Sequence, residues 1–251
     1  MYSGERVLIM QKKQTQKLPL VSVIMPVYNA QSYLVQAIES VISQSYKNFE
    51  FIIIDDHSTD HSWQIIQSYQ QQYPQLIRAK RLRKNRNSGG DWAANEAYAL
   101  SSGAFIARMD ADDVMHEKRL EKQITFLLKH PEIAVLGCNA WVINQDGDIV
   151  GQKNQPTTHQ AIYKQYWINH PMINPSLMFR RQALFSNKQL YTNRFPHNND
   201  LYTFFSMLTQ GKLFANLSEK LVYYRVHGNN DSLKNFKKCF WNTLAIRIKA
   251  V

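Results

Sequence analysis

Two hydrophobic patterns alternate along the first half of the chain. Short apolar runs rich in β-branched residues, such as 20–25 and 49–54, predict buried strands. Between them, apolar residues recur every three or four positions, a spacing typical of helices. This alternation predicts a parallel sheet with helices on both faces, whose ligands bind at the carboxyl ends of the strands. We expect strands at 20–25, 49–54, 76–82 and 104–109, and helices at 30–43, 61–72 and 88–100.

The second half of the chain has a less regular pattern. A helix is expected at 116–129 and an apolar strand at 133–143, followed by Asp146-Gly147, a residue pair typical of hairpin turns. Beyond residue 152 the alternation is lost, because prolines divide the chain into loops. The remaining pattern predicts a helix at 200–208, a strand at 221–226 and a last helix at 233–251.

Carboxylates gather where two of the predicted strands end. Asp110, Asp112 and Asp113 follow one strand, and Asp55 and Asp56 follow an earlier one. Like charges this close raise one another's pKa unless a cation or hydrogen-bond donors stabilise them. A hard divalent cation prefers such oxygen ligands, but an acidic helix N-terminus explains the same residues without a metal. We expect both acidic groups to share a cleft, because the carboxyl ends of parallel strands meet at one edge.

Composition narrows the class of protein. With 251 residues, 44% of them hydrophobic, the chain can bury a large core, and a single domain is expected. The net charge of +11 suits an acidic partner such as phosphates, nucleic acid or anionic lipid. Cys138 and Cys239 are the two cysteines, which indicates a reducing compartment. The N-terminus lacks a signal-peptide pattern and no apolar run matches a membrane span, so we expect a cytoplasmic protein that could touch the inner face of the plasma membrane.

Two basic segments leave alternatives open. Residues 78–86 include six basic residues and no acidic one; they fit a solvated face, or a site for a phosphorylated or lipid-linked acceptor or an acidic bilayer. The segment 233–251 predicts a basic amphipathic helix. That helix could lie on an anionic membrane, or pack on its own domain or on a second subunit of a homodimer. Its apolar stripe comprises Phe236, Phe240, Leu244 and Ile248.

Several motifs, taken in order and spacing, resemble the family 2 glycosyltransferases of the GT-A fold. The first four are Pro26-Val-Tyr-Asn29, Ile-Ile-Asp55-Asp-His-Ser-Thr-Asp60, Asn87-Ser-Gly89 leading to Ala94-Asn95-Glu-Ala97, and Ala107-Arg-Met-Asp-Ala-Asp-Asp113. The resemblance continues at 119–123, 130–131, 174–180, 191–200 and 223–227, and so covers roughly residues 20–232. It implies an α/β fold with a Rossmann-like, mostly parallel central sheet, helices on both faces, an irregular acceptor half and a C-terminal helix.

The resemblance assigns roles in donor binding. Pro26, Tyr28 and the Asp55-Asp56 pair would hold the nucleoside, with the base stacked on Tyr28 and its edge read by Asn29. A turn punctuated by Pro and Asn is the alternative for this segment, and helix capping is the alternative for Asp55-Asp56. The further contacts to the nucleotide sugar implied by the resemblance are Asn87, Gly89, Asp110, Arg225 and His227. A surface Arg/His pair is the alternative for the last two.

The resemblance also assigns the metal ligand and the base. Asp112 would ligate Mg²⁺ or Mn²⁺ bridging the diphosphate, which stabilises the charge of the leaving group. An inverting transfer needs a base to take the proton of the acceptor hydroxyl, and that base falls on Asp200. A simple N-cap is the alternative for Asp200. Asp113 is expected to cap the next helix.

Three positions depart from the family pattern. Asn199 stands where Glu is common, beside the expected base. His57 replaces a usual Gly, where a side chain could touch the ligand or where a turn with positive φ could tolerate His. Asn174 stands where His is frequent, and we assign it no catalytic role.

We therefore expect a metal-dependent, inverting hexosyl- or N-acetylhexosaminyltransferase. It would move a sugar from a UDP-sugar to a hydroxyl of a glycan or lipid-linked acceptor, in the synthesis of bacterial surface polysaccharide, capsule or lipo-oligosaccharide. Residues 1–18 would be a flexible arm and 19–232 a single domain, with a nucleotide-binding half at 19–115 and an acceptor half at 116–232. A catalytically inactive nucleotide-sugar-binding protein is the alternative, favoured by Asn199. Nucleic-acid binding would leave the acidic strand ends unexplained.

Overall fold

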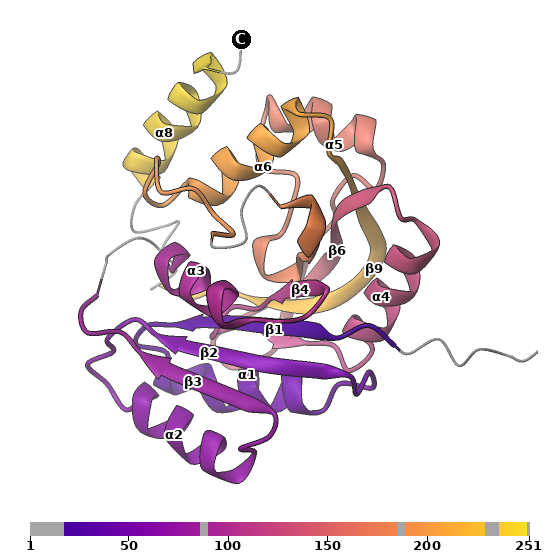
Figure 1. Cartoon of the computed structure of the whole chain (residues 1–251). Coiled ribbons are helices and arrows are strands. Elements are labelled where there is room, and N and C mark those ends of the chain that lie inside the picture. The colour runs from indigo at the N-terminus through magenta and orange to yellow at the C-terminus, as the bar shows by residue number, and fades with distance from the viewer. Residues whose placement is uncertain (1–17, 86–89, 185–188, 229–235, 250–251) are drawn as a thin grey trace, which may run out of the picture.

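A nine-stranded sheet forms the centre of the protein (Figure 1). The computed structural model describes residues 18–85, 90–184, 189–228 and 236–249, so the predicted arm lies almost wholly outside it.

The strand order is β3-β2-β1-β4-β8-β6-β9-β5, and β7 pairs with β6. The strands are β1 (Val21–Val27), β2 (Phe49–Asp55), β3 (Ile77–Arg81), β4 (Phe105–Arg108), β5 (Val114–Met115), β6 (Ile133–Ile143), β7 (Ile149–Lys153), β8 (Met178–Arg180) and β9 (Leu213–Arg225). The helices are α1 (Gln31–Ile42), α2 (Ser62–Gln72), α3 (Asp91–Leu100), α4 (Arg119–Lys129), α5 (His159–Tyr166), α6 (Asn199–Thr209) and α8 (Phe236–Lys249), with short 3₁₀ turns at Asn174–Ser176 and Arg181–Ala183.

The first four strands are parallel, as the alternation of strands and helices predicted. β1 pairs with β2 and with β4, and β2 pairs with β3, all in parallel. In this register Val27, the last residue of β1, lies beside Asp55, the last residue of β2. The loops that follow these strands therefore leave the same edge of the sheet, where the sequence predicted the ligand site.

The second half of the chain turns the sheet into a mixed one. β8 is antiparallel to both β4 and β6, whereas β9 runs parallel to β6. β6 and β7 form the hairpin predicted from Asp146-Gly147, and Gly147 has φ 96°. The predicted parallel arrangement thus holds for β3-β2-β1-β4. β8 was not predicted, because a strand of three residues is too short to show a period.

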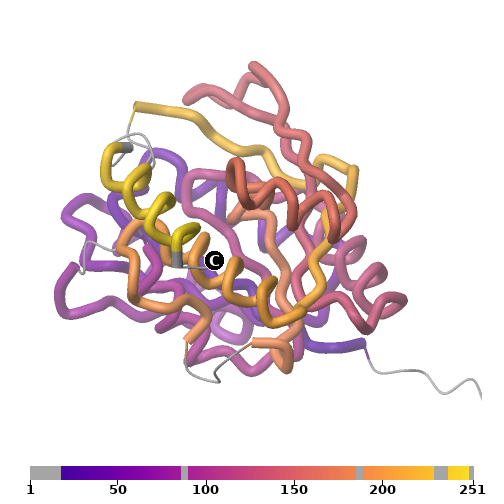
Figure 2. Tube along the Cα trace, turned by 90° about the horizontal axis from the view of Figure 1, so that it is seen from above, coloured from indigo at the N-terminus to yellow at the C-terminus, as the bar shows by residue number. Residues whose placement is uncertain are grey.

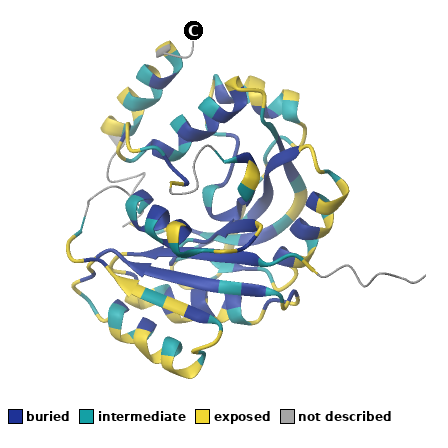
Figure 3. Cartoon of the chain, viewed as in Figure 1, coloured by how far each residue is buried: buried dark blue, intermediate teal, exposed yellow. Residues whose placement is uncertain are grey.

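Alternate residues of the central strands enter two different cores. Val23 and Met25 of β1 pack in the core that contains the apolar faces of α1 and α4, whereas Ile24 packs in the core that contains α3, α5 and α6. Figure 1 shows α1 and α2 on one face of the parallel strands and α3 on the other. Figure 3 shows β1 and β2 buried between helices whose outer faces are exposed, whereas the edge strand β3 is largely exposed. Both faces of the sheet are covered, as strands with continuous apolar sequence require.

Helix α8 packs on the body with the opposite face from the one predicted. Ile246 is buried, and Asn242 donates to the carbonyl of Pro196 at 2.9 Å. The described members of the predicted apolar stripe face solvent together with Trp241, so the stripe does not pack on its own domain. Figure 2 shows α8 as an outer helix of the molecule. Among the described residues, no helix is long and apolar enough to cross a membrane. The exposed fractions are 57% for Phe240, 66% for Trp241, 43% for Leu244 and 66% for Ile248.

The basic run at 78–86 is partly structural. β3 is an edge strand of the sheet, and its basic side chains bind their neighbours. Arg78 donates to the carbonyl of Leu100 at 2.7 Å, and Lys80 pairs with Glu96 at 2.8 Å. Basic residues on an edge strand also discourage pairing with another chain. These contacts favour the alternative in which this run is a solvated face and not a site for an acceptor or a bilayer.

Candidate active site

Three carboxylates gather just beyond β4. One oxygen from each of Asp110, Asp112 and Asp113 lies within 4.8 Å of the others. Burial raises the pKa of Asp113 well above its usual range, and the charges of the other two add to this effect. Burial also raises the pKa of Asp110, although the guanidinium of Arg108, 2.7 Å from its Oδ1, opposes the rise. Asp113 Oδ2 is buried without a hydrogen-bond partner. Asp113 is buried and the other two are half-buried, and this concentration of negative charge and oxygen donors fits a hard divalent cation.

The end of β9 closes over these carboxylates. The Arg225 backbone N–H donates to Asp113 Oδ1 at 2.7 Å, and Arg225 Nε donates to the Asp112 carbonyl at 2.7 Å. His227 Nε2 lies 3.0 Å from Asp112 Oδ2. Arg225 is 2% exposed, so the alternative of a surface Arg/His pair is wrong. The expectation that Asp113 caps a helix is also wrong: its carboxylate binds β9, and α4 begins after Lys118 without a side-chain cap.

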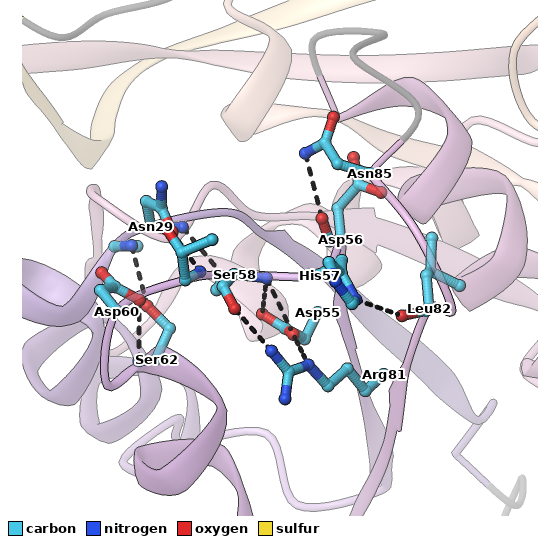
Figure 4. Close-up of polar contacts among 12 residues, drawn as sticks. Asn29, Asp55, Asp56, His57, Ser58, Asp60, Ser62, Arg81, Leu82 and Asn85 are labelled. Carbon is cyan, nitrogen blue, oxygen red and sulfur yellow. Dashed lines mark hydrogen bonds and ion pairs between the residues drawn. The ribbon is translucent and has the colours of Figure 1, made fainter.

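The loops after β1 and β2 are tied to each other (Figure 4). Asn29 accepts a hydrogen bond from the Thr59 backbone N–H at 2.8 Å through its Oδ1, and its own N–H donates to Ser58 Oγ at 3.0 Å. Asn29 and His57 both have positive φ, 48° and 62°. His57 therefore occupies the turn that tolerates positive φ, and its Nδ1 lies 3.2 Å from the carbonyl of Leu82.

Asp55 and Asp56 lie at the same edge as the cluster, on the other side of β1. Asp55 is fully buried, accepts the Ser58 N–H and pairs with Arg81 Nε at 3.1 Å (Figure 4). Asp56 is 3% exposed, and its carbonyl accepts from Asn85 at 3.0 Å. The helix-capping alternative is wrong for Asp55, whose carboxylate binds the loop and β3 and not the end of α2.

The remaining predicted donor contacts differ in exposure. Tyr28, just after β1, is 52% exposed and so leaves a ring face open. Pro26 lies buried inside β1, opposite Ile54 of β2. Asn87 and Gly89 lie outside the described residues. Tyr28 is therefore the member of this group whose side chain is accessible to a ligand.

Asp200 lies in the first turn of α6, near the carboxylate cluster. Its Oδ1 accepts from the Leu201 N–H at 2.7 Å, and its Oδ2 lies 3.6 Å from His170 Nε2. Burial alone would raise the pKa of Asp200, but His170, the Leu201 N–H and Arg108 lower it below its usual range. In turn, the charge of Asp200 helps to raise the pKa of Asp110. An ionised carboxylate in this place could accept a proton.

Asn199 has two buried partners that explain why it is not a Glu. Its Oδ1 accepts from the Phe195 N–H at 2.7 Å, and its Nδ2 donates to Asp91 Oδ2 at 2.9 Å. Asn199 is 1% exposed and Asp91 is 5% exposed. A Glu at this position would face a second buried carboxylate, which is costly. α3 thus places a buried carboxylate beside position 199.

Sequence reasoning missed three residues that shape this region. Asn95 on α3 accepts from the backbone N–H groups of Leu190 and Tyr191 and donates to the Tyr191 carbonyl. Arg108 is buried beside Asp110, and a charged residue inside an apolar strand was an available signal. His170 carried no signal, because its contact with Asp200 depends on the path of the preceding loop.

A sequence model of known proteins, described as "Glycosyl transferase family 2", matches residues 22–187. An uncharacterized glycosyltransferase of Haemophilus influenzae is 30% identical over 93% of this chain and 78% of its own length. The WfaP protein of Escherichia coli, named as a UDP-Glc:α-D-GlcNAc-diphosphoundecaprenol β-1,3-glucosyltransferase, is 28% identical over 88% of this chain and 83% of its own length.

Solved structures share the fold at lower identity. Staphylococcus aureus TarS 1–349 in complex with UDP-GlcNAc superposes with a TM-score of 0.72 at 20% identity, covering 91% of this chain and 66% of TarS. The mannosyltransferase PcManGT of Pyrobaculum calidifontis, in complex with GDP-Man and Mn²⁺, gives a TM-score of 0.69 at 17% identity, covering 93% of this chain and 65% of PcManGT. The chain thus spans about two thirds of these solved chains.

Proposed function

The chain belongs to glycosyl transferase family 2, and on that premise we propose that it transfers a sugar from a UDP-sugar to an acceptor hydroxyl with inversion. The membership makes it a glycosyltransferase, with relatives in bacterial polysaccharide synthesis. The observation that carries the finer proposal is that Asp200 of α6 lies close enough to the carboxylate cluster after β4 for its charge to raise the pKa of Asp110. A donor site and a base are then adjacent, as a displacement at one carbon requires.

We assign the donor site to the edge where β1, β2 and β4 end. Tyr28 offers its exposed ring to the base, and Asn29, Asp55 and Asp56 shape the surrounding loops. The proposed contacts to the nucleoside also include Pro26, Asn87 and Gly89. Asp110 lies toward the sugar, and Arg225 fixes the position of the cluster through Asp112 and Asp113.

Asp112 and His227 are the residues we propose to hold Mg²⁺ or Mn²⁺. The two side chains already approach each other at 3.0 Å, and PcManGT, a protein of similar fold, is described with Mn²⁺. A bound divalent cation would neutralise charge on the departing nucleoside diphosphate. Asp200 takes the proton of the acceptor hydroxyl, because its carboxyl is ionised at neutral pH and lies beside the carboxylate cluster that we assign to the donor.

The acceptor proposed is a glycan or a lipid-linked sugar at the inner face of the plasma membrane. WfaP, which is named for a diphosphoundecaprenol acceptor, supports the lipid-linked class. The exposed aromatic and aliphatic residues of α8, next to Lys237 and Lys238, suit the interface of an anionic bilayer. α8 contacts Pro196, close in sequence to Asp200. A bilayer against α8 would therefore lie near the acceptor site.

Adding UDP with Mn²⁺ should raise the melting temperature, by several degrees when the ligand exceeds its Kd about a hundredfold. Asp112→Asn should weaken the shift, while Asp146→Asn, in an exposed hairpin turn, should leave it unchanged. Absence of a shift with any nucleotide would overturn the donor proposal.

Hydrolysis of nucleotide sugars without acceptor should then identify the donor. An inactive binding protein would show the thermal shift without turnover. Asn199, the feature that favoured this alternative, is accounted for by its bonds to Asp91 and Phe195.

A further inference from the structure

The imidazole of His170 has its two nitrogens in different environments. The Met172 backbone N–H points at Nδ1 at 3.3 Å, so Nδ1 accepts. In the neutral ring the proton then lies on Nε2. Nε2 is buried, has no partner within hydrogen-bond distance, and faces Asp200 Oδ2 at 3.6 Å. The tautomer fixed by the backbone therefore aims a donor at the carboxylate.

Aromatic side chains around His170 hold its ring in this orientation. Its ring lies against Tyr166 of α5, with ring centroids 5.5 Å apart, and edge-on to Phe204 of α6 at 6.0 Å. Tyr166 is fully buried, and its hydroxyl has no hydrogen-bond partner. The 3.6 Å separation is one short adjustment from a hydrogen bond, and such bonds often tighten only when substrate binds.

We propose that His170 is a positioning residue for Asp200: its Nε2–H donates to Oδ2 and orients the carboxylate toward the acceptor hydroxyl. This inference rests on the proposed role of Asp200 as the base. The Leu201 N–H already holds Oδ1, so a donor on Oδ2 fixes the remaining rotation of the carboxyl. Oδ2 keeps a lone pair for the incoming proton.

Other charged and titratable groups also face Asp200. Arg108 and Asp110 act from β4 and the loop after it, Tyr166 from α5, and Tyr191 from the segment before α6. Arg108 lowers the pKa of Asp200, as His170 does, whereas burial raises it. Loss of the His170 donor therefore leaves burial less opposed, and the pKa of Asp200 rises.

Two substitutions separate the two nitrogens. In His170→Asn, the amide oxygen can keep the bond from Met172, but no donor reaches Asp200. In His170→Gln, the longer amide places a donor near the Nε2 position. We expect His170→Asn to lower kcat for hydrolysis of UDP-glucose or UDP-N-acetylglucosamine with Mn²⁺ roughly 10- to 100-fold. The KM for donor should stay unchanged, the acid limb of the pH profile should move to higher pH, and His170→Gln should restore much of the loss.

A carboxyl-¹³C NMR titration, with the Asp200 signal assigned from Asp200→Asn, tests the same claim without turnover. The pKa of Asp200 should rise in His170→Asn and fall back in His170→Gln. An unchanged pKa and pH profile in His170→Asn, or equal losses in both variants, would overturn the inference. Asp200→Asn separates the two proposals: if it keeps turnover, the base lies elsewhere, whereas if it is inactive and His170→Asn behaves as wild type, only the role of His170 fails.

Discussion

At the scale of single residues, the pair Asp91 and Asn199 shows how a departure from the family pattern is compensated. The amide of Asn199 donates to a buried carboxylate from another helix. We expect Asn199→Glu to destabilise the protein by about 3 kcal/mol, because it places an unpaired charge beside Asp91. Urea denaturation measures the change. Adding Asp91→Asn should restore most of it, and a double variant as unstable as the single one would contradict the pairing.

We expect the ionised carboxylate of Asp113 to destabilise the metal-free protein. Its pKa is raised in the folded state, so its ionisation destabilises the fold as pH rises through that pKa, and this cost is absent at low pH. Asp113→Asn keeps an oxygen for the Arg225 N–H and removes the charge. We expect it to raise the free energy of unfolding at pH 7 by about 1 kcal/mol or more in the presence of a chelator.

Measuring the free energy of unfolding at pH 7 and at acidic pH tests this prediction for Asp113. The gain from Asp113→Asn should shrink as the pH is lowered, since wild-type Asp113 then becomes neutral as well. Asp146→Asn, in the exposed turn between β6 and β7, should change stability little at either pH. A loss of stability in Asp113→Asn at pH 7 would mean that the carboxylate is needed by the fold itself.

The sequence predicted which acidic residues form the cluster, but not which residues bind them. Asp110, Asp112 and Asp200 come together because each follows or opens an element with a clear hydrophobic pattern. The contacts of Arg225 and His170 were not predictable, since each depends on the path of a loop with no period. The roles of all these residues in binding and catalysis stay predictions.

At the scale of elements, α8 carries the proposal of membrane contact. Replacing Phe240 and Trp241 by Ser removes two exposed aromatic side chains without touching Ile246, which packs inward. We expect co-sedimentation with vesicles containing phosphatidylglycerol to weaken about tenfold or more. Ile149→Ser with Val150→Ser on β7, at 55% and 59% exposure, is the matched control and should bind like wild type. Equal binding by both variants would remove α8 as the contact.

The turn from α3 into β4 depends on Gly103. A Cβ built there would lie 2.7 Å from the Leu20 carbonyl oxygen and from the backbone N of Ser22. Gly103→Ala should therefore destabilise the protein by about 1–3 kcal/mol in urea denaturation. Gly151→Ala on β7, where a Cβ would meet Val142 only at 3.8 Å, should be nearly neutral. A similar cost at both positions would mean that the close approach at Gly103 is not its cause.

Long elements with a strong period were predictable, and short ones were not. The strands around β1 appear within a few residues of their predicted bounds, because each is buried on both faces. β9 begins at Leu213 and not near 221, since Ser218 to Lys220 interrupt its apolar sequence. α5 and β8 were missed altogether. The stripe of α8 was predicted, but sequence periodicity alone does not tell which side of a helix meets the protein.

At the scale of the whole molecule, the two proposed halves share one sheet. β8 pairs with β4 of the first half, and β5, just after β4, pairs with the long strand β9. The proposed boundary near residue 115 therefore separates two functional halves of one domain and not two separately folding domains. The donor edge and Asp200 keep their relative positions because Asn95 of α3 also binds the chain at Leu190 and Tyr191.

The pairing of β4 with β8 has a consequence for synthesis on the ribosome. Sixty-nine residues separate Arg108 from Met178, so at 5–20 residues per second the edge of β4 waits roughly 4 to 14 seconds for its partner. During that time an apolar strand of a partly formed sheet is open to pairing with other nascent chains. The nascent protein should therefore depend on chaperones that shield strand edges, and slower translation of residues 109–177 should lengthen the interval in which it aggregates.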